Sequence, residues 1–314
     1  MFFMPPRPSE RGRKDRCLAG AINPAGPRED QLDEVFDIHT HVISPDTVRY
    51  PLAPLGGKQS DWSRTRPVDA AGLIAQMDAA GVAKAAVVHA STAYGIDNSY
   101  VADSVAAHPD RFTGVFSIDM FAADAGAQFD RWSRAGLTGL RLFTTGSTHP
   151  GQAEGLADPR TFPIWERAQA AKMSVCLQMQ PEGVPDLLIL LKRFPTVPIV
   201  LDHLARPKLA DGAPYRAAAW LFDLAVYPNL YLKLTSRTVE QSAEGASTPE
   251  AFFPKLVAAY GANRIAWGSN FPSHAGPMSH MVDAARRALA SLSDADRAAI
   301  FSGTARTLYP ALAR

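Results

Sequence analysis

The chain has 314 residues, of which 46% are hydrophobic, and its 32 basic and 31 acidic residues leave a formal net charge of +1. A composition this apolar excludes a disordered chain, and the balanced charge argues against a general nucleic-acid binder, which needs a concentrated basic surface. With only two cysteines, a disulfide-rich secreted scaffold and a cysteine-rich zinc module are both disfavoured.

Residues 1–33 are rich in proline, glycine and charge and show no hydrophobic period, which predicts a disordered tail. This segment lacks the apolar run of about 7 residues that a signal peptide requires. No part of the chain holds the roughly 18 uninterrupted apolar residues of a membrane helix. We therefore expect a cytoplasmic protein that binds neither membranes nor nucleic acid.

From residue 34 onward, short β-branched runs alternate with alanine-rich amphipathic stretches. Strands are predicted to begin near Val35, Ala85, Phe112, Gly139, Ser174, Pro198, Leu230 and Arg264. Helices are predicted at residues 69–80, 99–107, 161–171, 184–194, 215–226, 249–260, 278–289 and 293–301. Strands that alternate with helices predict parallel pairing, and about 280 residues suit a single α/β domain, a distorted (β/α)8 TIM barrel over 34–314. A doubly wound open sheet is the alternative, but no G-x-G-x-x-G follows the first strand.

Polar side chains gather where the predicted strands end, which is where a barrel carries its functional groups. His39 and His41 lie two residues apart on the first strand, so both imidazoles can face the barrel mouth and bind a metal or, when protonated, a carboxylate. A lone His-x-His is also a common chance pattern, and only the joint pattern favours a site. The other strand ends supply His89, Ser91, Arg141, Gln178, Gln180, Asp202, His203, Arg206, Lys233, Ser236, Arg237, Asn270 and His274. The long connection at 42–68 is predicted to be a lid or binding loop.

The runs FDIHTH (36–41), VLDHLARP (200–207) and RIAWGSNFP (264–272) together resemble the amidohydrolase-related family of TIM-barrel hydrolases. The nearest branch is the one that holds 2-pyrone-4,6-dicarboxylate lactonase and 4-sulfomuconolactone hydrolase. GLRLF (139–143), KLTS (233–236) and FSGTARTLYP (301–310) extend the resemblance over about residues 35–310.

The resemblance implies roles for individual residues. His39, His41 and His203 match the family's active-site histidines and, if a metal is bound, its ligands. Arg141 and Arg206 match positions that bind substrate carboxylates, which suits the planar guanidinium group. Ser91, Gln178, Lys233 and Arg237 are expected to line the same pocket.

Two departures from the family pattern bear on the chemistry. Gln178 stands where a bridging lysine or a histidine ligand is expected, so a two-metal site is not predicted. Asn270 stands where the family usually has the aspartate that activates water, and an amide is no useful proton acceptor near neutral pH. His274, His203 or a metal-bound hydroxide would then take the proton.

The sequence therefore predicts a hydrolase that opens a carboxylated lactone or related cyclic ester in small-molecule metabolism of the aromatic-degradation type. It would use one divalent ion, most reasonably zinc, or none. One alternative is a metal-dependent decarboxylase of an aromatic or muconate-type acid, and another is a catalytically silent barrel that binds a small acid. The expected partner is a small anionic substrate, with a homodimer as the default assembly.

Overall fold

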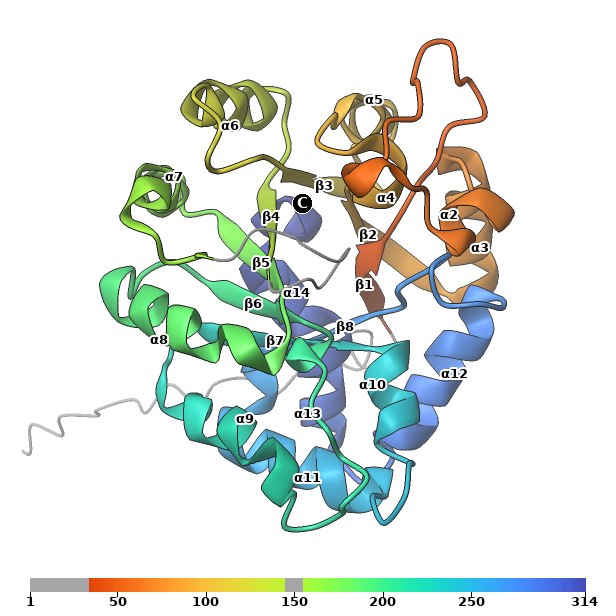
Figure 1. Ribbon diagram of the computed structural model, residues 1–314. Coiled ribbons are helices and arrows are strands. Elements are labelled where there is room, and N and C mark those ends of the chain that lie inside the picture. The colour runs from red at the N-terminus through yellow and green to blue at the C-terminus, as the bar shows by residue number, and fades with distance from the viewer. Residues whose placement is uncertain (1–33, 145–154) are drawn as a thin grey trace, which may run out of the picture.

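The computed structural model describes residues 34–144 and 155–314, so the predicted tail at 1–33 lies outside the described residues. Its centre is one eight-stranded sheet in the order β1 to β8, with every pair parallel (Figure 1). The strands are β1 (Val35–Thr40), β2 (Val82–Val88), β3 (Phe112–Ser117), β4 (Gly139–Phe143), β5 (Ser174–Gln178), β6 (Ile199–Asp202), β7 (Leu230–Thr235) and β8 (Ile265–Gly268). β1 also lies against β8, and a parallel bridge between Thr40 and Phe271 brings the two edges together. The predicted (β/α)8 barrel is confirmed.

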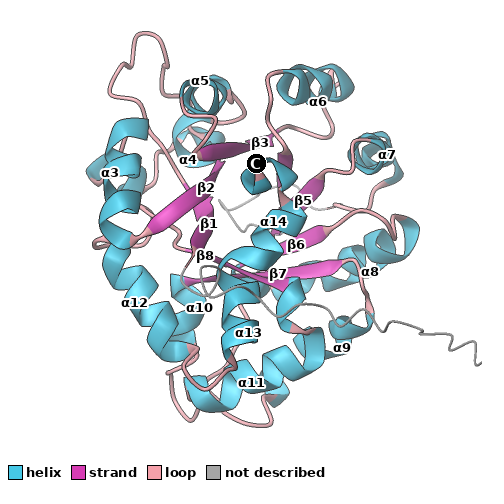
Figure 2. Cartoon of the chain, turned by 180° about the vertical axis from the view of Figure 1, so that it is seen from behind, coloured by secondary structure: helices cyan, strands magenta, loops and turns pink. Residues whose placement is uncertain are grey.

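The helices surround this barrel (Figures 1 and 2). They are α2 (Asp61–Thr65), α3 (Ala70–Ala80), α4 (Ser91–Tyr94), α5 (Ser99–Ala107), α6 (Ala125–Arg134), α7 (Phe162–Ala170), α8 (Val184–Arg193), α9 (Ala219–Asp223), α10 (Ser236–Gln241), α11 (Pro249–Tyr260), α12 (Met278–Ala288), α13 (Asp294–Ala298) and α14 (Thr304–Leu308). Within the two described ranges, no helix is both long and apolar enough to cross a membrane.

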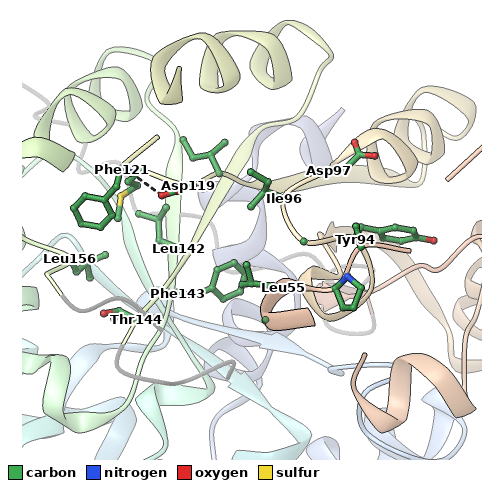
Figure 3. Close-up of a pocket in the computed structure, with 16 residues that line it drawn as sticks. Leu55, Tyr94, Ile96, Asp97, Asp119, Phe121, Leu142, Phe143, Thr144 and Leu156 are labelled. Atoms are coloured by element: carbon green, nitrogen blue, oxygen red, sulfur yellow. Dashed lines mark hydrogen bonds between the residues drawn. The ribbon is translucent and has the colours of Figure 1, made fainter. Parts of the chain in front are cut away.

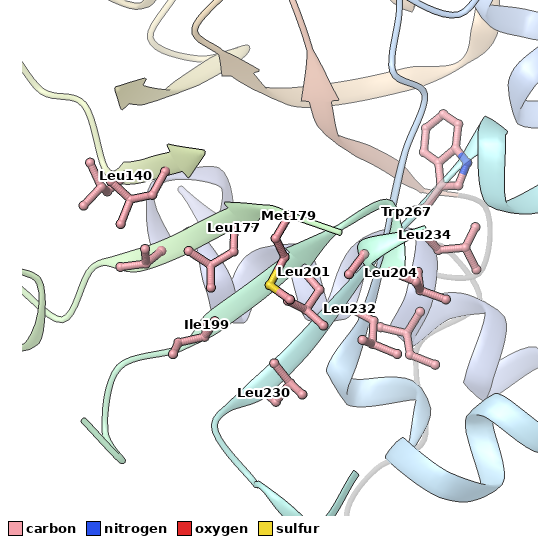
Figure 4. Packing of buried hydrophobic residues seen from close by; sticks show 14 of the residues in the cluster. Leu140, Leu177, Met179, Ile199, Leu201, Leu204, Leu230, Leu232, Leu234 and Trp267 are labelled. Atoms are coloured by element: carbon pink, nitrogen blue, oxygen red, sulfur yellow. The ribbon is translucent and has the colours of Figure 1, made fainter. Parts of the chain in front are cut away.

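Two packed layers hold the barrel together. Between the strands and the outer helices lies the larger apolar cluster, of which Figure 4 shows Leu177, Leu201 and Leu232 on neighbouring strands. A smaller cluster fills the barrel interior and includes Tyr309, at the end of α14. Gly139 leaves room for that ring, because a Cβ at this position would lie 2.8 Å from a ring carbon of Tyr309. The end of the barrel near α14 is thereby closed, and the opposite end remains for a site.

Several predicted helices end at the residues that their capping signals indicate. The helix at 249–260 begins with Pro249 after Thr248, whose side chain accepts the backbone N–H of Ala251. The helix predicted at 69–80 ends at Gly81, which adopts φ 69° as a left-handed cap. Local hydrogen-bonding chemistry fixes such ends, so the sequence alone predicts them.

The helix predicted over 215–226 is wrong as a continuous element. It begins with Tyr215 in the left-handed region at φ 62° and divides into two short 3-10 turns around α9. The helix predicted over 293–301 also divides, because α13 passes into a π turn at Ala299–Gly303 before α14. α6 was not predicted, although its buried Phe129 and Trp132 have helical spacing.

Candidate functional site

A cavity of about 190 Å³ opens where the strands end at the C-terminal face of the barrel. It is lined by many of the residues predicted from strand ends: His41, Ser91, Arg141, Gln178, His203, Arg206, Arg237 and Asn270. The sequence analysis gave no role to the remaining lining residues, although it named His89 among the strand ends: Ser60, Trp62, His89, Ala90, Thr92 and Ser273. We call this cavity the cationic pocket, because three of its side chains are guanidinium groups.

A bulge in β1 turns its histidines toward the cationic pocket. Phe36 and Ile38 pack inside the barrel, so strict alternation along the strand would point His39 outward. Between Asp37 and Thr40, however, β1 advances three residues while β2 advances two, and the extra residue reverses the alternation. The Asp37 carboxylate accepts the backbone N–H of His39 at 2.9 Å and so supports the bulge.

The approach of β8 to this bulge requires a glycine. A Cβ on Gly268 would lie only 2.6 Å from the Cβ of His39, far inside contact distance. The next two residues join the strands, because Ser269 donates its backbone N–H to Asp37 and Asn270 donates its own to the His39 carbonyl, each at 2.9 Å. The G-S-N sequence therefore fixes the place where the last strand meets the first.

Three imidazole rings lie together at this place. The ring centroid of His39 is 5.0 Å from that of His41 and 4.9 Å from that of His203. His41 and His203 line the pocket, whereas His39 is fully buried and its ring nitrogens have no hydrogen-bond partner among the described residues. Its Nδ1 is 3.7 Å from Asp202. The indole of Trp62 stacks on His41 with centroids 5.2 Å apart, which covers that ring.

The protonation of the two lining rings follows from their partners. Nδ1 of His41 is 2.8 Å from the Val88 carbonyl, which can only accept, so this nitrogen carries the proton and Nε2 keeps its lone pair. Nδ1 of His203 is 2.8 Å from the Thr235 hydroxyl. Burial, together with the positive charge of Arg141, lowers the pKa of each ring to about 3. Both rings are therefore neutral near pH 7.

This neutrality predicts a loss of stability in acid. Unfolded His203 takes up a proton near pH 6.5, whereas the folded ring has a pKa of about 3. The unfolded state then binds more protons between these values, so stability falls as pH falls. We expect His203→Asn to reduce the slope of the free energy of unfolding against pH by about 1 kcal/mol per pH unit, as measured by urea unfolding. Burial raises the pKa of Asp37 to about 6, which has the opposite effect on the pH dependence of stability. Because Asp37 is present in both proteins, its contribution cancels when the variant is compared with the parent. Equal slopes would contradict the assignment.

A left-handed turn presents two of the lining side chains. His203, Leu204, Ala205 and Arg206 have φ values of 54°, 53°, 55° and 58°, and the Arg206 N–H closes the turn on the His203 carbonyl at 2.9 Å. This region costs an L-residue about 1–2 kcal/mol. Leu204 and Ala205 are fully buried, so packing holds the turn in place. Backbone strain is thus stored where His203 and Arg206 enter the pocket.

Asp202 lies beside the ring of His39 and joins two buried cations. Its carboxylate oxygens lie 2.8 Å from Nε of Arg141 and 2.7 Å from Nζ of Lys233. Burial alone would raise its pKa, but Lys233 and Arg141 outweigh burial and hold the pKa of Asp202 well below its usual range. Arg141 also donates to Gln178, so Asp202 and Gln178 together fix the orientation of its guanidinium plane.

Among the described residues that line the pocket, three are arginines and none is acidic. Burial lowers the pKa of the Arg206 guanidinium, and the neighbouring charges of Arg237 and Arg141 lower it further. Three guanidinium groups therefore repel one another across one small cavity, and a bound anion would relieve that repulsion. The arrangement is that of an anion-binding site.

Besides His39, two further predicted site residues do not line the pocket. Lys233 was expected to line the pocket, but its side chain is fully buried, with Nζ between Asp202 and the Cys176 sulfur at 3.3 Å. His274 was expected to replace the missing acid, but its Nε2 lies 3.4 Å from the Glu240 carboxylate and it does not line the pocket. Its backbone turns away because its N–H donates to the Asn270 carbonyl at 2.7 Å.

The long connection after β1 supplies residues that the strand-end argument missed. Trp62 and Ser60 come from this loop, and the Ser60 hydroxyl lies 2.8 Å from that of Thr92, which also lines the pocket. The length of the loop was the available signal, because it predicted a lid or binding loop without naming residues. His89 lines the pocket too, with Nε2 at 2.9 Å from the Gly95 carbonyl.

The imidazole cluster does not have the form of a metal centre. Within 34–144 and 155–314, no group of three or more histidine, cysteine, aspartate or glutamate side chains is spaced to hold one ion. The neighbouring carboxylate of Asp202 already pairs with Arg141 and Lys233, and the strand-eight position is the amide Asn270. The three guanidinium groups that line the pocket would also repel a divalent cation. The donor set therefore does not fit the zinc ion that the sequence left open.

The amidohydrolase family model matches residues 36–311, so the chain belongs to this family of hydrolases. A 4-sulfomuconolactone hydrolase from Rhizobium radiobacter is 26% identical over 77% of this chain and 76% of its own length. An L-fucono-1,5-lactonase from Burkholderia ambifaria is 30% identical, but the match spans only 37% of this chain and 40% of the lactonase. The family resemblance drawn from the three motifs is confirmed.

Solved structures share the fold at lower identity. A Pseudomonas putida protein assigned as a 2-pyrone-4,6-dicarboxylic acid hydrolase has a TM-score of 0.71 and 22% identity, with 88% of this chain and 97% of that one covered. An amidohydrolase from Burkholderia multivorans with bound zinc has a TM-score of 0.70 and 20% identity, covering 88% and 99%. The 5-carboxyvanillate decarboxylase from Sphingomonas paucimobilis has a TM-score of 0.61 and 17% identity, covering 88% and 99%. At these identities the likeness concerns the fold alone.

Proposed function

We propose that the protein hydrolyses a lactone or related cyclic ester that carries a carboxylate. The observation that carries the proposal is the cationic pocket, in which three guanidinium groups surround two neutral imidazoles at the mouth of a barrel. Relatives named as lactone hydrolases support the same class of reaction. Arg206 and Arg237 would hold the substrate carboxylate, and Arg141 would face the ring carbonyl.

In this proposal His41 moves the proton. Its Nδ1–H is fixed on the Val88 carbonyl, so Nε2 accepts a proton from the attacking water as the oxygen bonds to the lactone carbonyl carbon. Arg141 stabilises the negative charge that develops on the carbonyl oxygen. The ring C–O bond then breaks, the imidazolium returns its proton to the departing alkoxide, and the product is an open hydroxy acid.

Substrate binding is expected to make His41 a stronger base. In the free protein the pKa of His41 is about 3, lowered by burial and, next, by the positive charge of Arg141. A bound carboxylate offsets the positive charge nearby, so the pKa of His41 rises when the substrate is present. Trp62, stacked on the ring, shields it from bulk water. Proton transfer is therefore favoured in the complex over the free protein.

The carboxylate clamp is tested with paired substrates. For 5-oxotetrahydrofuran-2-carboxylate, Arg206→Gln is expected to lower kcat/KM by about 10- to 100-fold, the loss of a charge-assisted contact. For γ-butyrolactone, which lacks the carboxylate, the same variant is expected to show little change. Arg216→Gln removes an exposed arginine outside the pocket and serves as the control. An equal loss of kcat/KM for both lactones would contradict the proposal that Arg206 binds the substrate carboxylate.

Product analysis separates the other candidate functions. Ring opening consumes water and yields one new carboxylic acid per turnover, whereas a decarboxylase releases carbon dioxide. A silent binding barrel would be stabilised by small acids without turning any of them over. Acid release followed by titration, together with carbon dioxide detection, therefore distinguishes the three.

A further inference from the structure

A second cavity of about 570 Å³ lies beside the cationic pocket, where β2, β3 and β4 end. Its walls are mainly apolar and come from five separate segments; Figure 3 shows Phe121 and Leu142 on one side of it and Leu55 and Tyr94 on the other. Ile96 and Phe121 are 45% and 37% exposed, high values for large apolar side chains. We call this cavity the apolar pocket.

The apolar pocket and the cationic pocket share their dividing walls. α4 gives Ser91 to the cationic pocket and Tyr94 to the apolar one. At the end of β4, the guanidinium carbon of Arg141 lies 4.9 Å from the ring centroid of Phe143, and each residue lines its own side. The loop after β1 likewise contributes to both, with Leu55 on one side and Trp62 on the other. The two cavities are therefore neighbours at the same end of the barrel, divided at β4 by the Arg141–Phe143 contact.

The two pockets differ in the charge of the residues that line them. Among the described residues that line the apolar pocket, none is basic, and the charged ones are Asp97 and Asp119. One oxygen of each carboxylate already accepts hydrogen bonds within the chain: Oδ1 of Asp97 from the backbone N–H and hydroxyl of Ser99, and Oδ1 of Asp119 from the backbone N–H of Phe121 at 2.9 Å. A second acidic group of a ligand would be repelled here, and a polyhydroxylated one would find few hydrogen-bond partners.

We propose that the apolar pocket is a substrate subsite that binds an uncharged aryl or alkyl arm, while the carboxylate end of the same molecule lies in the cationic pocket. This inference rests on the proposed function and narrows its substrate class to amphipathic lactone acids. Burial of a phenyl-sized arm removes enough apolar surface from water to raise affinity by about 10- to 100-fold.

The test is a binding measurement with two non-reacting acids. Isothermal titration is expected to show benzylsuccinate binding about 10- to 100-fold more tightly than succinate to the parent protein. Ile96→Asp and Phe121→Asp each place a carboxylate on the wall of the apolar pocket, and each is expected to reduce this ratio to within about threefold of unity. Ile189→Asp is the matched control, because Ile189 is 50% exposed on α8 and lines neither pocket, and it should keep the parent ratio.

Two results would overturn the subsite: equal affinity of the two acids for the parent protein, or a ratio that the wall substitutions leave unchanged. Thermal unfolding of each variant verifies that the fold is intact, and because both positions are solvent-exposed, folding is expected to persist. Ring opening is measured separately from binding. A protein that prefers benzylsuccinate but opens no carboxylated lactone would support the subsite and contradict the proposed hydrolysis, so the two failures are distinguishable.

Discussion

Asp202→Asn is expected to lower the free energy of unfolding by about 3–5 kcal/mol, the cost of leaving a buried charge without its partner. Asp202 and Lys233 both have fully buried side chains, and Nζ lies 2.7 Å from the carboxylate. The substitution keeps the shape of the side chain and removes only its charge. Two cations, Lys233 and Arg141, then remain beside the imidazoles with no counter-charge, so activity should fall together with stability.

A second substitution shows whether the charge is the cause. In the Asp202→Asn background, Lys233→Met removes the stranded ammonium group, and we expect about half of the lost stability to return. Asp103→Asn is the control, because its ion pair with Arg49 is exposed, and its effect should be within about 0.5 kcal/mol. Urea unfolding of the four proteins gives the comparison. A double variant no more stable than Asp202→Asn alone would show that shape or hydrogen bonding, and not charge, sets the cost.

The strands and most helices were predictable because their signals are local. β-branched runs, an N-cap such as Thr248 followed by Pro249, and a left-handed Gly81 act within one turn of the chain, so no tertiary information is needed. The break in the predicted helix at 215–226 depends on Tyr215, a fully buried ring that packs edge-on against Phe252 from α11. No window of the sequence contains that contact.

Some features of the site could likewise be predicted from the sequence, and others could not. That strands one, four and six bring His41, Arg141 and His203 together follows from barrel topology, which the order of elements already implied. The bulge that reorients His39, and the left-handed turn at His203, depend on packing against other strands. Lys233 illustrates the limit: its position in the β7 sequence fits a lining residue as well as a buried partner of Asp202, and only the assembled barrel decides between them. The catalytic roles of these residues stay predictions.

Asn270→Asp is expected to raise kcat for carboxylated lactones by about 10- to 100-fold and to raise KM as well. Asn270 lines the cationic pocket with φ 63°, a left-handed conformation that aspartate tolerates as asparagine does, so the backbone should not change. The new carboxylate gives the attacking water a second proton acceptor beside His41, at the position where the family usually has its water-activating aspartate. It also cancels part of the positive charge that holds the substrate, which weakens binding.

Separate kcat and KM values for two further variants make this result interpretable. Asn270→Ala is expected to lower kcat, because the amide no longer orients water or the carbonyl, and Asn263→Asp, at an exposed position outside the pocket, should change neither constant. If Asn270→Asp lowers kcat as much as Asn270→Ala does, the reaction needs the amide itself as a hydrogen-bond donor. The chemistry of this chain would then differ from carboxylate-assisted attack of water, and a lining imidazole such as His41 would accept the proton.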